Sequence, residues 1–319
     1  MAGKAGKTVL LLATCATVLL VGANTANANF SGTNGLIVFD SWAHTSFDIG
    51  VFDPNGNGTP RWLTTTPDFS EHEPRWSPDG SKIVYVGHPQ FIDDVSLTHD
   101  IWVMDADGQH KTQLTNTPLR EEVPAWTADG RIVYCGQSGD GGGWEIYRIN
   151  ADGSGLKRLT TSAGFDCWPS PAPTGDKLAF TTLRNGVPEI YIMNLNGTGL
   201  RKAVDGYASD WSPTGNNLAF NRDDPDANGV PDGDADVWMS HADGSGLRRL
   251  TNTPSNIESF PTWSPDGTTI VFGRIVASGV YNIFGLDLAS GDEQLLLADD
   301  PLNSYDSVAY PSWQPLSKP

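Results

Sequence analysis

A phrase that recurs along the chain constrains the fold more than any other feature. Clear copies are residues 73–80 (EPRWSPDG) and 260–267 (FPTWSPDG), each followed by a short apolar run. The position of the tryptophan recurs at 76, 126, 171, 211, 263 and 313, with Pro171 in place of tryptophan in one copy. A repeat of about 45 residues is typical of the four-stranded blade of a β-propeller.

A second phrase follows the first within the repeats. One copy is residues 100–108 (DIWVMDADG), which leads to the dipeptide Leu114-Thr115. Proline at the second position and glycine at the fourth suit a type I turn, and Asp-Gly closes a tight hairpin. Each repeat therefore predicts four strands joined by short turns, in which the aspartates and glycines are structural rather than catalytic.

The two ends of the propeller region complement each other. Residues 35–39 match a second strand with no first strand before them, and residues 310–315 match a first strand with nothing after them. We expect the C-terminal strand to join the first blade, because a closed ring leaves no strand edge exposed. The prediction is an all-β, six-bladed propeller of four-stranded antiparallel blades.

These repeats resemble those of TolB-like propellers, in which Trp-Ser-Pro-Asp-Gly precedes an apolar strand, Ile-Tyr, Asp-Gly and Leu-Thr. The resemblance covers nearly all of residues 29–319 and implies a single propeller domain there. TolB carries an α/β domain before its propeller, and only about ten residues separate Ala28 from the first expected strand. We therefore expect a propeller lacking the TolB N-terminal domain, and no hydrolase domain after it.

The first 28 residues predict an export signal. Lys4 and Lys7 precede an apolar run over residues 9–23, and small residues at 26–28 suit cleavage after Ala28. The apolar run is short for a membrane span. A lipoprotein signal at Cys15 is the disfavoured alternative, because the apolar run continues beyond it. The expected location is the periplasm or the exterior, without membrane insertion.

The charge balance excludes some partners. The chain has 38 acidic and 20 basic residues, giving a formal net charge of −18, and its lysines and arginines form no cluster. Proteins that bind nucleic acid or anionic membranes carry a basic face. We therefore expect neither as a partner, and we expect a monomer.

Acidic side chains recur five residues before the tryptophan position, where the innermost strand of a blade begins. Four such carboxylates are expected to ring the mouth of the central channel, with His72 and three arginines beside them. A basic peptide or protein segment would be attracted there; the alternative is a solvated acidic rim with partial salt bridges. The predicted mouth residues are Glu71, Glu121, Asp166, Glu258, His72, Arg184, Arg222 and Arg274.

The histidines offer a weaker signal. Repeat alignment places His44 and His88 in loops after second strands of adjacent blades, and His72 in an inner strand. These could converge as metal ligands or bases; scattered loop histidines are otherwise solvated.

A long acidic loop predicts calcium binding. Residues 224–236 (DPDANGVPDGDAD) place oxygen-bearing residues at alternate positions, as in EF-hand-like loops, although Ala235 replaces the usual bidentate glutamate. The alternative is a flexible acidic hairpin. The candidate ligands of a structural Ca²⁺ are Asp224, Asp226, Asn228, Val230, Asp232 and Asp234.

Two cysteines remain after residue 28. Cys135 ends the second strand of the third blade, and Cys167 begins the first strand of the fourth. In an exported protein such a pair forms a disulfide or remains as two buried thiols; we favour the disulfide.

Three classes of function remain open. The preferred hypothesis is an exported, non-catalytic propeller that binds a protein or peptide at its acidic channel mouth. The sequence has no Gly-x-Ser-x-Gly, His-Glu-x-x-His or Cys-x-x-Cys motif. A metal-assisted hydrolase or lyase acting on small molecules or glycans is the second hypothesis, and a structural scaffold is the third, so whether the protein is an enzyme stays open.

Overall fold

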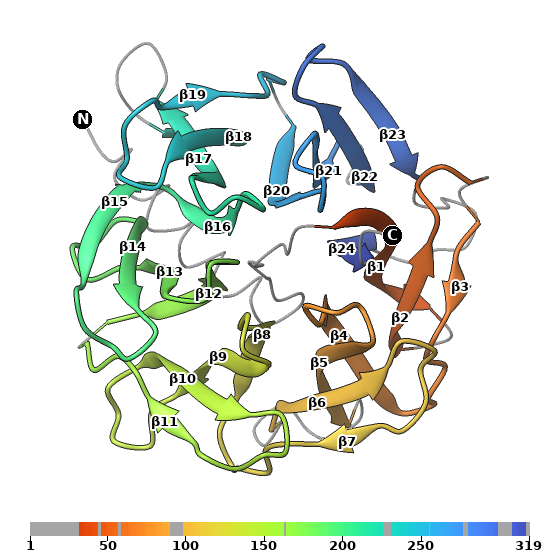
Figure 1. Cartoon of the computed structure of the whole chain (residues 1–319), viewed down its shortest axis with the longest axis vertical. Helices are drawn as coiled ribbons and strands as arrows, with labels where there is room; N and C mark the ends of the chain where they lie inside the picture. Colours follow the sequence, from red (N-terminus) through yellow and green to blue (C-terminus); the bar gives the residue numbers. More distant parts are fainter. Residues whose placement is uncertain are drawn as a thin grey trace, which may run out of the picture.

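The repeats form a closed ring of six blades (Figure 1). The computed structural model describes residues 32–43, 46–56, 59–89, 98–162, 164–225, 231–254, 256–276, 280–298 and 308–316. Within these ranges no helix is long and apolar enough to cross a membrane. The all-β, six-bladed prediction is confirmed.

Each blade is a four-stranded antiparallel sheet whose first strand lies innermost. The first blade contains β24 (Val308–Leu316), β1 (Thr33–Ala43), β2 (Ser46–Phe52) and β3 (Arg61–Trp62). The second contains β4 (Phe69–Trp76), β5 (Lys82–Pro89), β6 (Asp100–Asp105) and β7 (Thr112–Gln113), and the third β8 (Glu121–Trp126), β9 (Arg131–Gln137), β10 (Trp144–Asn150) and β11 (Lys157–Arg158). The fourth contains β12 (Asp166–Pro171), β13 (Lys177–Thr182), β14 (Glu189–Asn194) and β15 (Arg201–Asp205). The fifth contains β16 (Tyr207–Trp211), β17 (Asn217–Pro225), β18 (Pro231–His241) and β19 (Arg248–Arg249), and the sixth β20 (Ile257–Trp263), β21 (Thr269–Ile275), β22 (Tyr281–Asp287) and β23 (Glu293–Leu297).

The C-terminal strand closes the ring as the sequence predicts. β24 pairs antiparallel with β1, where Ile37 lies opposite Trp313 and Val38 opposite Ser312. The first blade therefore combines the two ends of the propeller region, and its inner edge is covered.

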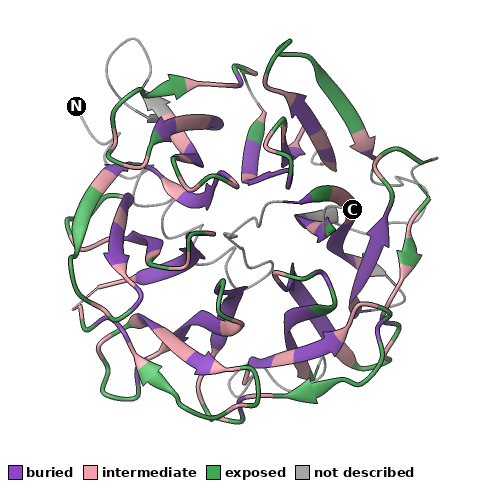
Figure 2. Ribbon diagram, viewed as in Figure 1, coloured by how far each residue is buried: buried purple, intermediate pink, exposed green. Residues whose placement is uncertain are grey.

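The hydrophobic core is divided among the boundaries between neighbouring blades. Six clusters of buried side chains each join one blade to the next. In one of them Trp76 of the second blade packs with Val38 and Ile49 of the first. The repeated tryptophan is buried because it fills such a boundary. Figure 2 shows in purple that much of the interior of the ring is buried.

Every inner strand carries the same backbone irregularity. Three residues before the tryptophan position, a non-glycine residue adopts a left-handed conformation with φ between 50° and 60°, next to a register shift. Such residues cost conformational energy and persist only where the surroundings hold them. The six left-handed residues are Glu73, Val123, Trp168, Ala208, Phe260 and Tyr310.

Side chains of the preceding blade hold several of these left-handed residues. The amide of Glu73 donates to Asp40 (3.2 Å) and that of Phe260 donates to Asn221 (2.8 Å). Asp40 and Asn221 each directly follow the aromatic residue of the second strand of their blade. Thr181 occupies the same position in its own blade and accepts the amide of Ala208 (3.1 Å). At the boundary of the third and fourth blades this position is Cys135, which forms a disulfide with Cys167.

The Leu-Thr dipeptide has a structural role of the same kind. The Thr115 hydroxyl oxygen accepts the amide of Ile101 (2.8 Å), and Thr160 likewise accepts that of Ile146 (2.9 Å). The Thr160 hydroxyl donates to the buried Glu145 (2.5 Å). In the third blade, Glu145 near the start of the third strand therefore links that strand to Thr160, just after the outer strand.

Candidate functional site

The four predicted mouth carboxylates are buried near the start of their inner strands. Their exposed fractions are 1% for Glu71, 5% for Glu121, and 0% for Asp166 and Glu258. We call the side of the ring where the inner strands begin the mouth face, and the opposite side the turn face. The carboxylates lie under the mouth face and do not form a solvated rim.

Three of these carboxylates are neutralised within their own blades. Glu71 pairs with Lys111 (2.7 Å), and Asp166 pairs with Arg184 (3.2 Å). Glu258 pairs with Arg274 (2.6 Å), its register partner on β21.

The predicted arginines therefore divide into two groups. Arg184 and Arg274 form ion pairs with mouth carboxylates, as described above, and each also lies 4.6 Å from the centroid of an aromatic ring. Arg222 instead lies over the ring of Trp238, 5.1 Å from its centroid. The structure therefore brings the acids and two of the arginines together in pairs, not in one common ring.

Glu121 is held differently from the other three. Its carboxylate accepts the hydroxyl of Thr117 (3.0 Å). Burial raises the pKa of Glu121 to about 7, the nearby charge of Asp100 adds to the rise, and hydrogen bonds from Thr115 and Thr117 oppose it.

Some sequence predictions cannot be placed. His44 lies outside the described residues, as do residues 226–230 and the side chains of 224, 225 and 231–234 of the predicted calcium loop. The two cysteines are placed, and their Cα atoms are 5.0 Å apart, within the range of disulfides.

A buried group of charges lies where the first three blades meet. We call it the ionic cluster. Its carboxylates are at most 2% exposed, and burial raises the pKa values of Glu73 and Glu122 to about 8. The positive charges of Arg75 and Arg120 oppose the rise for Glu73, and that of Arg120 opposes it for Glu122. The ionic cluster comprises Asp40, Glu73, Arg75, Arg120 and Glu122.

Arg75 extends this group toward the opposite side of the ring. It is 2% exposed, and burial lowers the pKa of its guanidinium to about 9. The charge of Asp210, on the inner strand of the fifth blade, is the largest influence opposing that shift. Its Nη1 donates to the carbonyl oxygens of Pro74 (2.7 Å) and Tyr310 (3.4 Å). Arg75 therefore connects the inner strands of the first and second blades, and the charge of Asp210 acts on it from the fifth.

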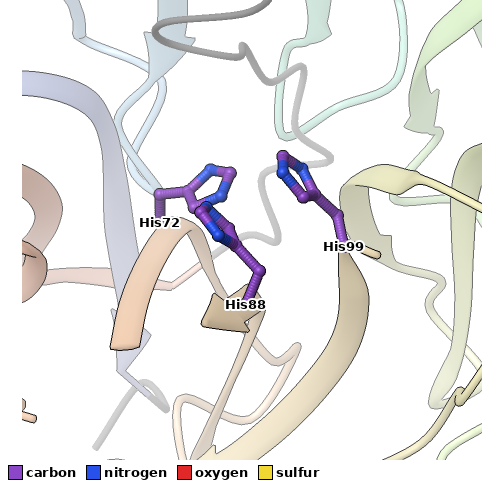
Figure 3. Close-up of side chains that lie close together, drawn as sticks. All are labelled: His72, His88 and His99. Atoms are coloured by element: carbon purple, nitrogen blue, oxygen red, sulfur yellow. The ribbon is translucent and has the colours of Figure 1, made fainter. Parts of the chain in front are cut away.

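Three histidines gather beside the ionic cluster (Figure 3). His72 lies on β4, His88 on β5, and His99 directly before β6, so one blade supplies all three. One ring nitrogen from each lies within 4.8 Å of the other two. Burial lowers the pKa values of His72 and His88 to about 3 and also lowers that of His99, so the rings are neutral at pH 7.

An aromatic row crosses the mouth face over the third, fourth and fifth blades. Ring centroids are 6.4 Å apart for Trp144 and Phe165, 5.4 Å for Phe165 and Trp168, and 6.1 Å for Trp168 and Tyr207. Trp168 is buried, and the other three are partly exposed. We call these four residues the aromatic row.

Sequence reasoning missed the ionic cluster, the aromatic row and the participation of His99. These residues vary among the repeats, so the period that identified the blades carries no information about them. One usable signal was the run Phe165-Asp166-Cys167-Trp168, which is more aromatic than its counterparts in the other repeats.

Comparison with known proteins agrees with this architecture. The family model of the TolB beta propeller domain matches residues 73–232, which is half of the chain. The chain belongs to the TolB β-propeller family. The resemblance inferred from the repeats is thereby confirmed.

Individual relatives of this family are more distant. An uncharacterised protein of Agrobacterium fabrum is 32% identical over 184 residues, covering 53% of this chain and 60% of that protein. The Tol-Pal system protein TolB of Anaeromyxobacter dehalogenans is 29% identical over 126 residues, covering 38% of this chain and 27% of that protein. The matches therefore span less than two thirds of these relatives.

Solved structures show the shared fold. The crystal structure of TolB from Acinetobacter baumannii superposes with a TM-score of 0.72 at 21% identity, covering 90% of this chain and 67% of that one. At such identity the likeness establishes the propeller and leaves the function to the site residues.

Proposed function

We propose that this TolB-family propeller is an exported, non-catalytic protein that binds a protein or peptide partner on its mouth face. The aromatic row carries the proposal, because partly exposed aromatic side chains are enriched in protein interfaces and dominate their binding energy. The named role of the Anaeromyxobacter relative in the Tol-Pal system supports a protein partner and a periplasmic location.

The charge of the protein favours a partner with a basic segment. The formal net charge of −18 attracts cationic segments over long range, even though three mouth carboxylates are locally paired. In this proposal the overall field accelerates association, and the aromatic row supplies the contact that keeps the partner bound.

The test measures how two pairs of substitutions in this protein change its affinity for a partner isolated from periplasmic or culture-fluid extract. Replacing Phe165 and Tyr207 by alanine should weaken binding by about 2 kcal/mol, or about 30-fold, because contact area with the partner is lost. The matched control replaces Leu156 and Leu200, exposed apolar residues beside the Asp152-Gly153 and Asn196-Gly197 turns on the turn face. Equal losses in both pairs would exclude the aromatic row as the binding surface.

A metal-assisted hydrolase or lyase is the second candidate. The observation that favours it is the convergence of His72, His88 and His99 within one blade. Turnover of a small-molecule or glycan substrate that required these histidines would support this candidate over the binding protein.

Calcium binding by residues 224–234 remains part of the proposal as a structural role. Changing Asp224 and Asp226 together to alanine should abolish any protection that calcium gives this loop against proteolysis. If calorimetry detects no binding at millimolar calcium, the loop is an acidic turn.

A further inference from the structure

We propose that His72, His88 and His99 form a binding site for a divalent first-row transition metal, with zinc as the defining probe. The imidazole nitrogens of these residues lie within 4.8 Å of one another. Neutral imidazole is a preferred ligand of zinc, copper, nickel and iron, whereas magnesium and calcium prefer oxygen. The site is separate from the predicted calcium loop and from the aromatic row.

Hydrogen-bond acceptors lie beside the Nδ1 atoms of the three rings. The Nδ1 atom of His88 lies 3.0 Å from the carbonyl oxygen of Pro89. The Nδ1 atom of His99 lies 3.2 Å from Glu122, and that of His72 lies 3.8 Å from Glu73. With acceptors beside the Nδ1 atoms of His88 and His99, protons on these two nitrogens would leave Nε2 of each ring to bind a metal, as is usual for metal-binding histidines.

The Nε2 atom of His72 provides a second, independent observation. It is buried and has no hydrogen-bond partner among the described residues, and His72 is only 7% exposed. A buried polar atom without a partner costs stability, so such atoms are rare unless a ligand or ion satisfies them. A metal bound between the rings would give this nitrogen its partner.

Two buried glutamates stand behind the histidines. Glu73 and Glu122 approach the histidines and are 0% and 2% exposed. Arg120 pairs with Glu122 (2.9 Å), and its Nη2 lies 3.4 Å from both ring nitrogens of His99, so this guanidinium must turn away when a metal binds. The two glutamates would then act as the outer partners that fix the ring orientations.

Binding requires a defined rearrangement of the rings. Zinc–nitrogen bonds of about 2.0–2.1 Å in a tetrahedral site place ligand nitrogens about 3.4 Å apart. The His88 and His99 rings are stacked, with centroids 4.1 Å apart and planes 9° from parallel. One of them must therefore tilt so that both ring planes meet at the ion. His88 is half-buried and adjoins the mouth face, so it is the ring that we expect to move.

Three protein ligands leave a fourth position for water or another ligand, the arrangement found in catalytic rather than purely structural zinc sites. The partly exposed His88 leaves that position accessible from the mouth face. The inference goes beyond the proposed partner binding and does not depend on it.

The experiment measures zinc binding by the full chain after chelator treatment and desalting. Isothermal titration should give one zinc per chain, and His88→Ala should weaken binding by at least about 100-fold through loss of a ligand. The control is the double variant His110→Ala and His241→Ala, which removes two exposed histidines and should bind as the wild type does. The proposal is wrong if the wild type binds no zinc or if His88→Ala binds it equally well.

Cobalt binding provides a second measurement, whose signal would be absent if the three histidines had only a structural role. The wild type with Co²⁺ should show the intense visible absorption of a four-coordinate ion with nitrogen ligands, which decides the question even if His88→Ala does not fold. Glu122→Gln should retain this spectrum and bind zinc about tenfold more weakly, because it removes only the partner of a ligand. A spectrum identical to that of cobalt in buffer would overturn the proposal.

Discussion

Two parts of the inner ring use the same backbone for different chemistry. In the ionic cluster, the left-handed Glu73 is held by Asp40, and its own carboxylate accepts the amide of the left-handed Val123 (2.5 Å). In the aromatic row, the left-handed Trp168 lies next to Cys167, whose disulfide takes the place of such a carboxylate. The repeat therefore dictates the bulge, while residues outside the repeat decide how it is fastened.

The fastening also determines what each part can do. Buried carboxylates and arginines create a neighbourhood suited to ions, beside which the three histidines lie. A disulfide and packed rings leave partly exposed aromatic edges suited to a protein surface. The predictions below test whether the two parts are stabilised by different forces.

The largest expected effect is at Arg75. Arg75→Met should lower the free energy of unfolding by about 3–5 kcal/mol, because it leaves buried carboxylates without their cation. Urea unfolding of the variant and the wild type measures this difference in free energy. The matched control is Arg131→Met, whose ion pair with Asp129 is partly exposed and should contribute at most about 1 kcal/mol. If Arg75→Met lowers the free energy of unfolding no more than Arg131→Met does, the ionic cluster is not stabilised by charge pairing.

The disulfide should have the next largest effect. Replacing Cys135 and Cys167 by serine should lower the free energy of unfolding by about 2–4 kcal/mol, because the bond closes a loop of 32 residues in the unfolded chain. Thermal unfolding with and without reductant measures the same quantity in the wild type. If reductant shifts the midpoint of the serine variant as much as that of the wild type, the effect does not come from this bond.

Glu121 should make stability depend on pH. Its folded pKa of about 7 exceeds the ordinary value of 4.5 for a glutamate, so the folded state binds the proton more tightly. The stabilisation is complete below pH 4.5 and is lost as pH rises through 7, by about 3 kcal/mol. Glu121→Gln should remove this part of the pH slope, whereas Asp166→Asn should mainly remove the partner of Arg184. An unchanged slope in Glu121→Gln would contradict the assignment.

The smallest effect is expected at Thr181. Thr181→Val removes the acceptor of the Ala208 amide at nearly constant side-chain volume, and should cost about 1 kcal/mol. Hydrogen exchange of that amide should accelerate by about tenfold, while the amide of Phe260, held by Asn221, should exchange as before. Unchanged exchange at Ala208 would mean that the side chain does not hold the left-handed residue.

The closed ring could be predicted from the sequence alone. The period of the Trp-Ser-Pro-Asp-Gly phrase determined the blade count, and the unmatched strands at residues 35–39 and 310–315 determined the closure, because strand pairing follows from repeating local patterns. Cysteines on adjoining strands of neighbouring blades, such as Cys135 on β9 and Cys167 on β12, could also be placed by counting repeats.

The surroundings of each functional side chain follow from the packing of the folded ring and not from the repeat pattern. Repeat alignment put Glu71 and Glu258 under one face, but their burial and their pairing with Lys111 and Arg274 depend on how the blades pack. His99 joins His72 and His88 because β4, β5 and β6 lie side by side; the repeat predicts these adjacent strands, but not the direction in which their side chains point. Burial sets the charge of such groups, and burial is a property of the assembled ring rather than of any one repeat.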